Sequence, residues 1–378
     1  MTHLLGAPDV LAPLPGVGKS LIDVIERHEL VGRGGAGFPV ATKWRAVAQR
    51  SDGEAVVVVN GAEGEPQSKK DRVLMAARPH IVLDGAFLAA RVVEASRIVL
   101  YIGKRHDTAR DAMLRALAQR AEPERAVVTV SEAPAQYVAG AETAAIHFIN
   151  EGVATPTATP PFPFERGVGG APTLVQNVET LAHVALLART GETPNRTLVT
   201  LAGGIAKPGV LEVARGTTIG EAVRRGGGTA ESARAILVGG YFGTWVEAGK
   251  AWDLALDHES MRKHGLSLGC GVIGVLPASR CPVCEVAGVM RYLARESSAQ
   301  CGPCFFGLRA LADACTRIAE PGSNPEVLER LARWVAEVRG RGACRHPDGA
   351  VMFLASALNV FAREFANHSA HDLMRQTA

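Results

Sequence analysis

Hydrophobic and polar positions in the first half of the chain form two kinds of pattern. The segments 55–60 (AVVVVN), 96–103 (SRIVLYIG) and 124–130 (ERAVVTV) are short, apolar and rich in β-branched residues, which predicts buried strands. Longer segments with apolar residues three and four positions apart predict helices at 20–30, 43–49, 79–95, 105–121 and 173–190. Strands alternating with helices predict an α/β layer built on a largely parallel sheet.

The pattern changes in the second half. Short alternating runs over 196–250 predict a small α+β unit with a hairpin turned at Pro208-Gly209. After about residue 281 the periodicity is helical, and four helices with short connections predict an antiparallel bundle at 282–296, 303–319, 325–339 and 347–366. We therefore expect three domains, which span residues 1–192, 193–255 and 256–378.

Composition narrows the class of protein. The net charge is only +3 over 378 residues, and no basic stripe carries interleaved aromatic residues, so we expect no nucleic-acid partner. No apolar run is long enough to span a bilayer, and the N-terminus lacks a charged and then apolar leader, so we expect a cytoplasmic chain without a membrane span. Six of the seven cysteines lie between Cys270 and Cys315, and this clustering favours metal or redox chemistry over disulfides.

A glycine-rich loop follows the first predicted helix. Residues 32–37 read Gly-Arg-Gly-Gly-Ala-Gly, and such a loop lets backbone N–H groups approach a phosphate. A helix rather than a strand precedes the loop, so the dinucleotide fingerprint of a Rossmann fold is not met. Arg33 and Lys43 on either side favour a phosphate cradle over a plain glycine turn.

A polar turn follows the strand at 55–60. Asn60 begins the stretch Asn-Gly-Ala-Glu-Gly-Glu-Pro, and ligands of open α/β sheets bind beyond the carboxyl ends of such strands. The amide of Asn60 suits the edge of a flavin, and Glu65 suits a nicotinamide amide or a ribose. A solvated acidic turn is the alternative at this point.

These motifs, with later ones, resemble the flavoprotein subunit of respiratory NADH dehydrogenase (NuoF type) and the related diaphorase subunits. The similar segments run in the family's order through nearly the whole chain: GRGGAGFP at 32–39, Lys43-Trp44, the N-x-x-E-x-E-P stretch at 60–66, Lys70-Asp71-Arg72, Gly140 to Thr143, PPFP at 160–163, Asn177 to Thr180, and Glu296-Ser297. The resemblance implies an FMN domain, a small β-grasp domain of the SLBB type, and a helical domain that carries a [4Fe–4S] cluster. It also implies that hydride passes from NADH to N5 of FMN, so no catalytic acid or base is required.

The resemblance assigns site residues one by one. The residues that match the FMN pocket, together with the rest of the glycine loop, are Gly32, Arg33, Gly34, Gly35, Gly37, Lys43, Asn60, Asn177 and Thr180. Phe38 and Phe162 resemble the aromatic walls on which NADH stacks, and Glu65 and Glu142 resemble acids that line that pocket.

The chain departs from the family around the dinucleotide. Ala141 stands where the family has the first Glu of a Gly-Glu-Glu triplet, and losing this acid removes repulsion against a 2′-phosphate, which would allow NADPH to be accepted. Thr159 stands for a lysine and Ala46 for an aromatic residue, and both changes weaken dinucleotide binding in general. We therefore expect FMN to be retained, with NADH or NADPH as the substrate.

The cysteine region keeps most of the family's ligand pattern. The family has C-x2-C-x2-C and a fourth cysteine about forty residues later, whereas this chain has Ser298-x2-Cys301-x2-Cys304-x39-Cys344. A [4Fe–4S] cluster would use the Ser298 oxygen or an outside ligand, and a [3Fe–4S] cluster would need only the three cysteines. Cys281 and Cys284 are further candidates, and one of them could supply the missing thiolate.

Spacing alone also fits a zinc site. Cys281-x2-Cys284-x16-Cys301-x2-Cys304 has the spacing of a four-cysteine zinc centre, and Cys301-Gly-Pro-Cys304 has that of a redox dithiol. The register of Cys344 favours iron–sulfur.

The function expected is a diaphorase-type oxidoreductase subunit that passes electrons from NAD(P)H through FMN and an iron–sulfur cluster to a partner. That partner would be an electron-transfer subunit or a ferredoxin-like protein, with the chain peripheral to a membrane complex. The departures at Ala46, Ala141, Thr159 and Ser298 leave two alternatives: an electron-relay or scaffold subunit that uses no dinucleotide, and a zinc-stabilised interaction protein.

Overall fold

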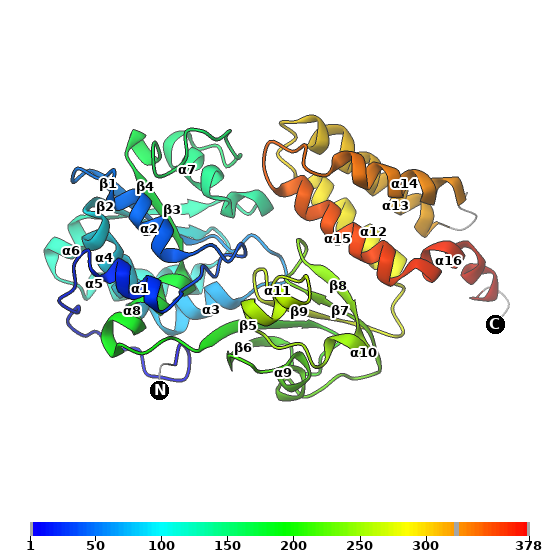
Figure 1. Cartoon of the computed structure of the whole chain (residues 1–378), viewed down its shortest axis with the longest axis horizontal. Helices are drawn as coiled ribbons and strands as arrows, with labels where there is room; N and C mark the ends of the chain where they lie inside the picture. Colours follow the sequence, from blue (N-terminus) through cyan, green and yellow to red (C-terminus); the bar gives the residue numbers. More distant parts are fainter. Residues whose placement is uncertain (1–2, 321–324, 376–378) are drawn as a thin grey trace. The chain divides into compact units, whose positions relative to one another are not determined.

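The computed structural model describes residues 3–320 and 325–375. The chain divides into two compact units: one comprises residues 1–200 and 210–215, and the other comprises residues 201–209 and 216–378. Figure 1 labels the helices and strands along the chain. The coarser prediction of a mixed α/β fold with a parallel sheet is confirmed.

A four-stranded sheet forms the centre of the first unit. Its order is β3-β2-β1-β4, all neighbours are parallel, and its strands are β1 (Ala55–Gly61), β2 (Ala95–Gly103), β3 (Val128–Ala133) and β4 (Thr173–Asn177). Side chains alternate between its two faces, so Val57 and Val59 pack in one core cluster, whereas Val56 and Val58 pack in another. Burial on both faces explains why β1 is a continuous run of apolar residues.

Helices and short helical turns precede, connect and follow these strands. They are α1 (Leu21–Arg27), α2 (Val40–Ala48), α3 (Lys70–Ala77), α4 (Pro79–Val93), α5 (Asp107–Ala118), α6 (Glu122–Ala126), η1 (Tyr137–Gly140), α7 (Glu142–Glu151), η2 (Val168–Gly170) and α8 (Val178–Thr190). Helix α4 is buried around nearly its whole circumference and packs against α8. This burial explains why α4 is apolar on most of its faces rather than on one stripe.

Two predictions in this unit were wrong in detail. The helix predicted over 173–190 begins only at Val178, because residues 173–177 form β4 beside β1. The strand predicted over 124–130 begins at Val128, after the short helix α6. A short apolar run does not distinguish strand from helix by periodicity, and here tertiary pairing decides.

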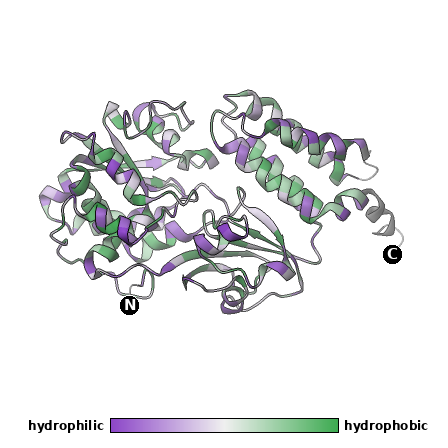
Figure 2. Ribbon diagram, viewed as in Figure 1, coloured by the Kyte–Doolittle hydropathy of each residue, from purple (hydrophilic) through white to green (hydrophobic). Residues whose placement is uncertain are grey.

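A five-stranded sheet follows, in the order β6-β5-β9-β7-β8. Its strands are β5 (Arg196–Gly203), β6 (Gly209–Ala214), β7 (Ala233–Val238), β8 (Thr244–Glu247) and β9 (Val272–Pro277). Neighbours β5 and β6 flank Pro208, as predicted. Three short helices accompany the sheet: α9 (Ile219–Arg225), α10 (Ala248–Ala251) and α11 (His258–Lys263). Figure 2 shows hydrophobic residues along the strands of both sheets.

The segment 256–378, predicted to be helical, starts differently. Strand β9 lies inside this segment and pairs antiparallel with β7, so the sheet continues to Pro277. After it come α12 (Pro282–Arg295), the π-helical turn η3 (Pro303–Leu308), α13 (Arg309–Ala319), α14 (Pro325–Val338), α15 (His346–Val360) and α16 (Ala362–Arg375).

The last predicted helix, 347–366, is two helices rather than one. They are separated at Phe361, whose side chain is buried and packs edge-on against Trp245 with ring centroids 5.4 Å apart. Anchoring this side chain in the core ends α15 and lets α16 turn away from it.

In the described part of the chain, no single helix has both the length and the apolar character to cross a membrane. Two bent pairs, Lys70–Ala77 with Pro79–Val93 and His346–Val360 with Ala362–His368, pass that test only when each pair is taken together.

Candidate functional site

The glycine loop is a closed turn between α1 and α2. The Gly32 N–H donates to the Phe38 carbonyl at 2.8 Å, and Val31 forms a bridge with Pro39. Gly35 and Gly37 have φ values of 117° and 61°, which side-chain-bearing residues rarely adopt. The glycines are therefore required by the backbone conformation of the loop.

The loop borders a cleft at the carboxyl ends of β1 and β4. The cleft is partly open to solvent, and its lining comes from the glycine loop, α2 and the ends of the two strands. Asn60 is the next-to-last residue of β1 and Asn177 is the last of β4, and the two are direct partners across the parallel ladder. The other residues that line the cleft are Gly32, Gly34, Ala36, Gly37, Phe38, Val40, Lys43, Gly140, Glu142, Val175 and Gln176.

Hydrogen bonds hold the two asparagines in place. The amide of Asn60 donates to the Gly140 carbonyl at 2.9 Å. The side-chain oxygen of Asn177 caps α8 by accepting from the N–H groups of Glu179 and Thr180, at 3.0 and 3.4 Å. Each amide is thus fixed before any ligand contact is made.

Lys43 is the cationic side chain of the cleft. Its ammonium group donates to the Val175 carbonyl at 2.8 Å and forms an ion pair with Glu142. Lys43 is one-fifth exposed and Glu142 is 44% exposed, so this pair lies at the edge of the cleft. A negatively charged ligand would therefore meet Lys43 already paired with an acid.

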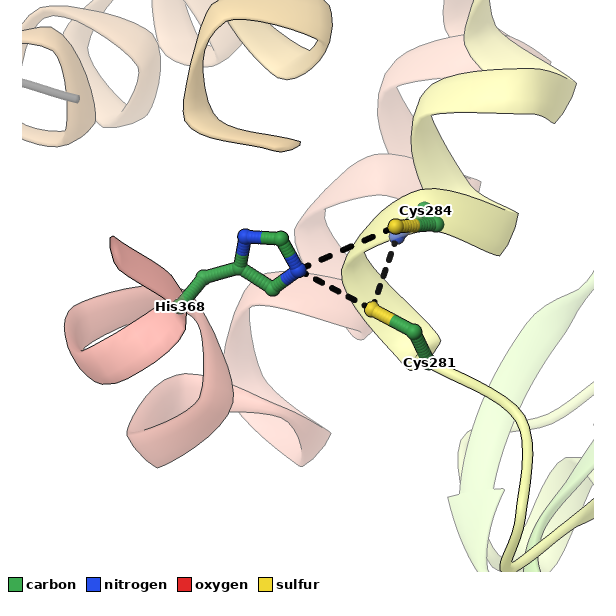
Figure 3. Close-up of side chains that lie close together, drawn as sticks. All are labelled: Cys281, Cys284 and His368. Carbon is green, nitrogen blue, oxygen red and sulfur yellow. Dashed lines mark hydrogen bonds between the residues drawn. The ribbon is translucent and has the colours of Figure 1, made fainter. Parts of the chain in front are cut away.

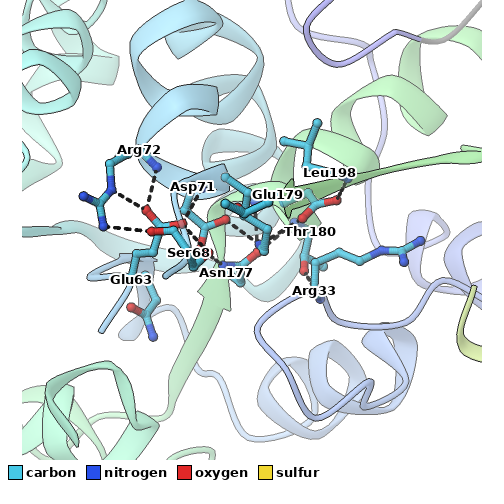
Figure 4. Close-up of polar contacts among 12 residues, drawn as sticks. Arg33, Glu63, Ser68, Asp71, Arg72, Asn177, Glu179, Thr180 and Leu198 are labelled. Carbon is cyan, nitrogen blue, oxygen red and sulfur yellow. Dashed lines mark hydrogen bonds and ion pairs between the residues drawn. The ribbon is translucent and has the colours of Figure 1, made fainter. Parts of the chain in front are cut away.

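A buried charge network lies behind Asn177 (Figure 4). The Asn177 amide donates to Asp71 at 2.7 Å, and Lys70 bridges Asp71 and Glu179 with N···O distances of 2.6 and 2.9 Å. Glu179 also accepts the Leu198 N–H at 2.9 Å. These contacts tie the end of β4 to α3 and to the start of β5.

Burial sets the protonation of this network. Burial raises the pKa of Asp71 to about 6, with the charge of Lys70 opposing it. Burial also acts to raise the pKa of Glu179, but Lys70 and a hydrogen bond from His183 hold it well below its usual range. Lys70 therefore sits between one firmly ionised carboxylate and one that titrates close to neutral pH.

Several residues predicted for the pocket lie beside the cleft rather than in its lining. The Arg33 N–H donates to the Thr180 hydroxyl at 2.8 Å, so these two residues brace the loop against α8. Glu65 is buried and accepts from the Tyr137 hydroxyl at 3.0 Å. Phe162 stacks on Phe164 with centroids 5.4 Å apart.

Five lining residues were missed by sequence reasoning. Four of them are small or apolar and the fifth is a glutamine whose side-chain oxygen accepts from the Trp44 indole: Ala36, Val40, Gly140, Val175 and Gln176. Recognising β4 as a strand would have pointed to Val175 and Gln176, since both lie next to Asn177 at its carboxyl end.

Three of the predicted metal-binding cysteines come together in the helical segment. The thiol of Cys304 is hydrogen-bonded to the sulfurs of Cys344 and Cys301. The hydrogen bond from Cys304, aided by the His346 N–H, lowers the pKa of Cys344 to about 6. The His346 ring bonds the Leu293 carbonyl at 2.8 Å, which places this group at the C-terminal end of α12.

Cys281 and Cys284 belong to a different group, as Figure 3 shows. They lie at the N-terminal end of α12, where the Nε2 atom of His368 is 3.1 and 3.7 Å from their sulfurs. About 13 Å of helix axis separates Cys284 from Leu293. This separation argues against two of the predictions. One was that Cys281 or Cys284 completes the cluster, and the other was that both share a zinc ion with Cys301 and Cys304.

The residues present fit the two cofactors that the resemblance implies. A Cβ atom added to Gly34 would lie 3.4 Å from the Asn177 Cβ, in van der Waals contact, so a larger side chain at this position would enter the space between the loop and the strand end. The three neighbouring thiols of Cys301, Cys304 and Cys344 are the soft ligands that iron–sulfur clusters use. Ser298 is half-buried in the loop before them.

Comparison with known proteins defines the class first. Residues 25–186 match the family model of the Nuo51 FMN-binding domain, and residues 285–368 match the NADH-ubiquinone oxidoreductase-F iron-sulfur binding region. The two predicted cofactors, FMN and an iron–sulfur cluster, agree with these models. A chain with both segments is of the flavin and iron–sulfur oxidoreductase class.

Individual relatives specify the family. The second F-type subunit of the NADH-quinone oxidoreductase of Rhizobium meliloti is 29% identical over 92% of this chain and 88% of its own length. The corresponding F-type subunit of Streptomyces coelicolor is 28% identical over 92% of this chain and 82% of its own. The resemblance inferred from the motifs is confirmed: the chain is a divergent relative of the flavoprotein subunit of NADH dehydrogenase.

A solved structure has the same fold. A chain of an NAD⁺-reducing [NiFe]-hydrogenase, in the H2-reduced state, superimposes with a TM-score of 0.82 at 30% identity. The match covers 92% of this chain but only 62% of the hydrogenase chain. The expectation of an oxidoreductase subunit agrees with all three relatives.

Proposed function

We propose that this chain is a diaphorase-type subunit that takes electrons from NADH or NADPH and passes them to a partner protein. The observation that carries the proposal is the cleft in which Asn60 and Asn177 face the glycine loop 32–37 at the ends of two parallel strands. When bound there, FMN supplies acceptance of a hydride and release of single electrons.

The chain's own residues bind and orient. We assign the phosphate to the loop of glycines and the flavin edge to the asparagine amides, with Lys43 as the cation in the cleft. Phe38 and Phe162 are 52% and 44% exposed, which suits rings that stack on a dinucleotide. Glu65 and Glu142 are the acids assigned to that ligand, and no side chain has to move a proton.

The finer domain assignments are part of this proposal. We infer that the five-stranded sheet belongs to a β-grasp domain of the SLBB type, with its boundary moved from residue 255 to the end of β9 at Pro277. The helical segment that follows would form the iron–sulfur domain, held by Cys301, Cys304 and Cys344 with Ser298 or an outside ligand at the fourth iron. The three-thiol group supports either a [4Fe–4S] or a [3Fe–4S] cluster.

The electron-accepting partner protein is also part of the proposal. The relatives are named as subunits of NADH-quinone oxidoreductase, and the structural neighbour is a chain of a hydrogenase. An electron-transfer subunit or a ferredoxin-like protein is therefore the acceptor that we propose. The cytoplasmic location expected in the sequence analysis stays a prediction.

Anaerobic reduction tests the proposal. Purified full-length protein would be mixed with NADH and, separately, with NADPH while the visible flavin band is followed. Rapid bleaching by either nucleotide is the expected result. A chain that binds FMN but is inert to both would instead support the electron-relay function, for which Ala46, Ala141 and Thr159 are the motivating departures. A chain that takes up no flavin would contradict both.

A further inference from the structure

The group of Cys281, Cys284 and His368 has no part in the proposed electron transfer. Its three ligand atoms lie within 4.8 Å of one another, although His368 follows Cys284 by 84 residues. Figure 3 shows the imidazole of His368, from α16, facing both sulfurs at the start of α12. We propose that these three residues bind a zinc ion that fastens α16 to the start of α12.

The distances fit a tetrahedral ion. With zinc about 2.3 Å from sulfur and about 2.1 Å from nitrogen, tetrahedral angles place sulfur and nitrogen ligands about 3.5 Å apart. The two sulfur–nitrogen distances, 3.1 and 3.7 Å, lie on either side of this value. Small rotations of the side chains therefore suffice to admit the ion.

The donor chemistry also favours zinc over a direct hydrogen bond. Sulfur is a weak hydrogen-bond acceptor, so two thiols are poor partners for an imidazole nitrogen. Thiolate and imidazole are in contrast the usual ligands of zinc, and a pair of cysteines two residues apart is its common spacing. The three side chains leave the fourth position of the ion to a donor outside the group.

The local backbone supports the same arrangement. Cys281 is the N-cap of α12, and the N–H of Cys284 donates to its sulfur at 3.3 Å. This bond holds the sulfur toward the start of the helix, as outer contacts do for metal ligands. The other attachments of α16 include the ion pair of Glu364 with Arg234 at 2.9 Å and the buried ring of Phe365.

The site is separate from the proposed cluster. Cys301, Cys304 and Cys344 gather at the opposite end of α12, so the two groups can be emptied independently. Zinc has no redox chemistry, and its role here would be to stabilise the fold rather than to carry electrons.

Metal analysis of the full-length chain tests this inference. Protein purified anaerobically from zinc-supplemented medium would be assayed for zinc, iron and FMN in the same sample. We expect about one zinc ion per chain. The double variant Cys281→Ser/Cys284→Ser and the variant His368→Ala should each lose at least about tenfold in zinc affinity, a change of about 1.4 kcal/mol, with iron and FMN unchanged.

Matched controls separate ligand loss from general damage. Cys270→Ser removes a thiol that bonds the Gly239 carbonyl, and His264→Ala removes an imidazole that bonds the Ser260 carbonyl, so both should keep wild-type zinc. In cobalt-loaded protein, the thiolate-to-cobalt charge-transfer bands should vanish in the double variant alone. This spectroscopic signal distinguishes sulfur ligation from metal bound elsewhere.

Three outcomes would overturn the inference. The wild type could hold no zinc, the variants could hold as much as the wild type, or iron could fall together with zinc in the double variant. The last result would show that these sulfurs belong to the iron–sulfur centre. FMN content and bleaching by NADH or NADPH report on the proposed function separately, so each idea can fail without the other.

Discussion

The nucleotide cleft and the cysteine region differ in what holds their functional side chains. In the cleft, Asn60 and Asn177 are fixed by protein hydrogen bonds, and a fully buried ion network backs the end of β4. In the cysteine region, the thiol of Cys304, in the π-helical turn η3, is hydrogen-bonded to Cys301 and Cys344, which lie in the loops before η3 and before α15. The cleft is therefore preorganised by the chain, whereas we expect the thiol groups to be held in place by the metals that we propose for them.

The largest expected effect is on the cluster. Cys304→Ser removes a buried thiol from the three-cysteine group and should abolish the iron–sulfur centre, because only two thiolates remain. Iron and acid-labile sulfide would be measured per chain. Cys315→Ser is the control, since burial raises the pKa of the Cys315 thiol to about 12 and marks it as a packed side chain. Unchanged iron in Cys304→Ser would contradict the assignment.

The converse substitution sharpens the cluster type. Ser298→Cys restores the family's C-x2-C-x2-C spacing, and we expect iron per chain to rise toward about four if the wild type holds a three-iron cluster. Electron paramagnetic resonance of the oxidised protein distinguishes the two clusters. An unchanged spectrum and iron content would show that the fourth position is already filled in the wild type.

The next largest effect concerns the support of the cleft. Lys70→Met leaves Asp71 and Glu179 buried without their cation, which should cost about 3–5 kcal/mol of stability. Urea unfolding measures the loss. Lys263→Met is the matched control, because its ion pair with Glu259 is exposed and contributes less than about 1 kcal/mol. Equal losses of unfolding free energy in Lys70→Met and Lys263→Met would argue that the buried ion network does not stabilise the end of β4.

A substitution in the glycine loop should act on the ligand rather than on the fold. Gly34→Val adds a branched side chain whose Cβ would lie 3.4 Å from the Asn177 Cβ. Its methyl groups should therefore block the cleft. We expect FMN affinity to fall about a hundredfold, or roughly 2.8 kcal/mol. Fluorescence titration of the flavin measures it. Gly18→Val, at a position with nothing within 4 Å of an added Cβ, should bind FMN normally.

The pH dependence of stability tests the charge network. Burial raises the pKa of Asp71 from 3.8 to about 6, so the folded chain holds its proton more tightly than the unfolded chain. Its contribution to stability is present below pH 3.8 and is lost as the pH rises through 6. Between about pH 4 and 7, the free energy of unfolding of the wild type should fall by on the order of 2 kcal/mol relative to that of Asp71→Asn. If the free energies of unfolding of the wild type and of Asp71→Asn changed equally with pH over this range, burial would not be raising the pKa of Asp71.

The smallest expected effect is on dinucleotide choice. Ala141→Glu restores an acid at the N-cap of α7, beside Glu142, and should repel a 2′-phosphate. We expect kcat/KM for NADPH to fall about tenfold relative to NADH, which is roughly 1.4 kcal/mol. Ala141→Gln has nearly the same size without the charge and should leave the ratio unchanged. A similar shift in both variants would indicate a steric cause.

The local pattern of the sequence was enough to predict the α/β layer and the glycine loop, whereas Phe38, Glu142 and Asn177 of the cleft were assigned only through the family resemblance. A short β-branched apolar run bounded by turn residues indicates a buried strand, as at β1, and helical periodicity indicates an amphipathic helix, as at α5. The loop could be recognised from its glycines, because residues with a side chain rarely adopt the positive φ values of Gly35 and Gly37. Asn60 could be found because it lies at the carboxyl end of a recognisable strand.

Only the tertiary structure decided the rest. Residues 173–177 form strand β4 because they pair with β1. Strand β9 pairs with β7, which lies many residues earlier in the chain. Contacts between distant segments also brought His368 to Cys281 and Cys284, and the length of α12 kept those thiols away from Cys304. Periodicity and spacing report on neighbours along the chain, whereas pairing, burial and ligand grouping depend on which distant segments pack together.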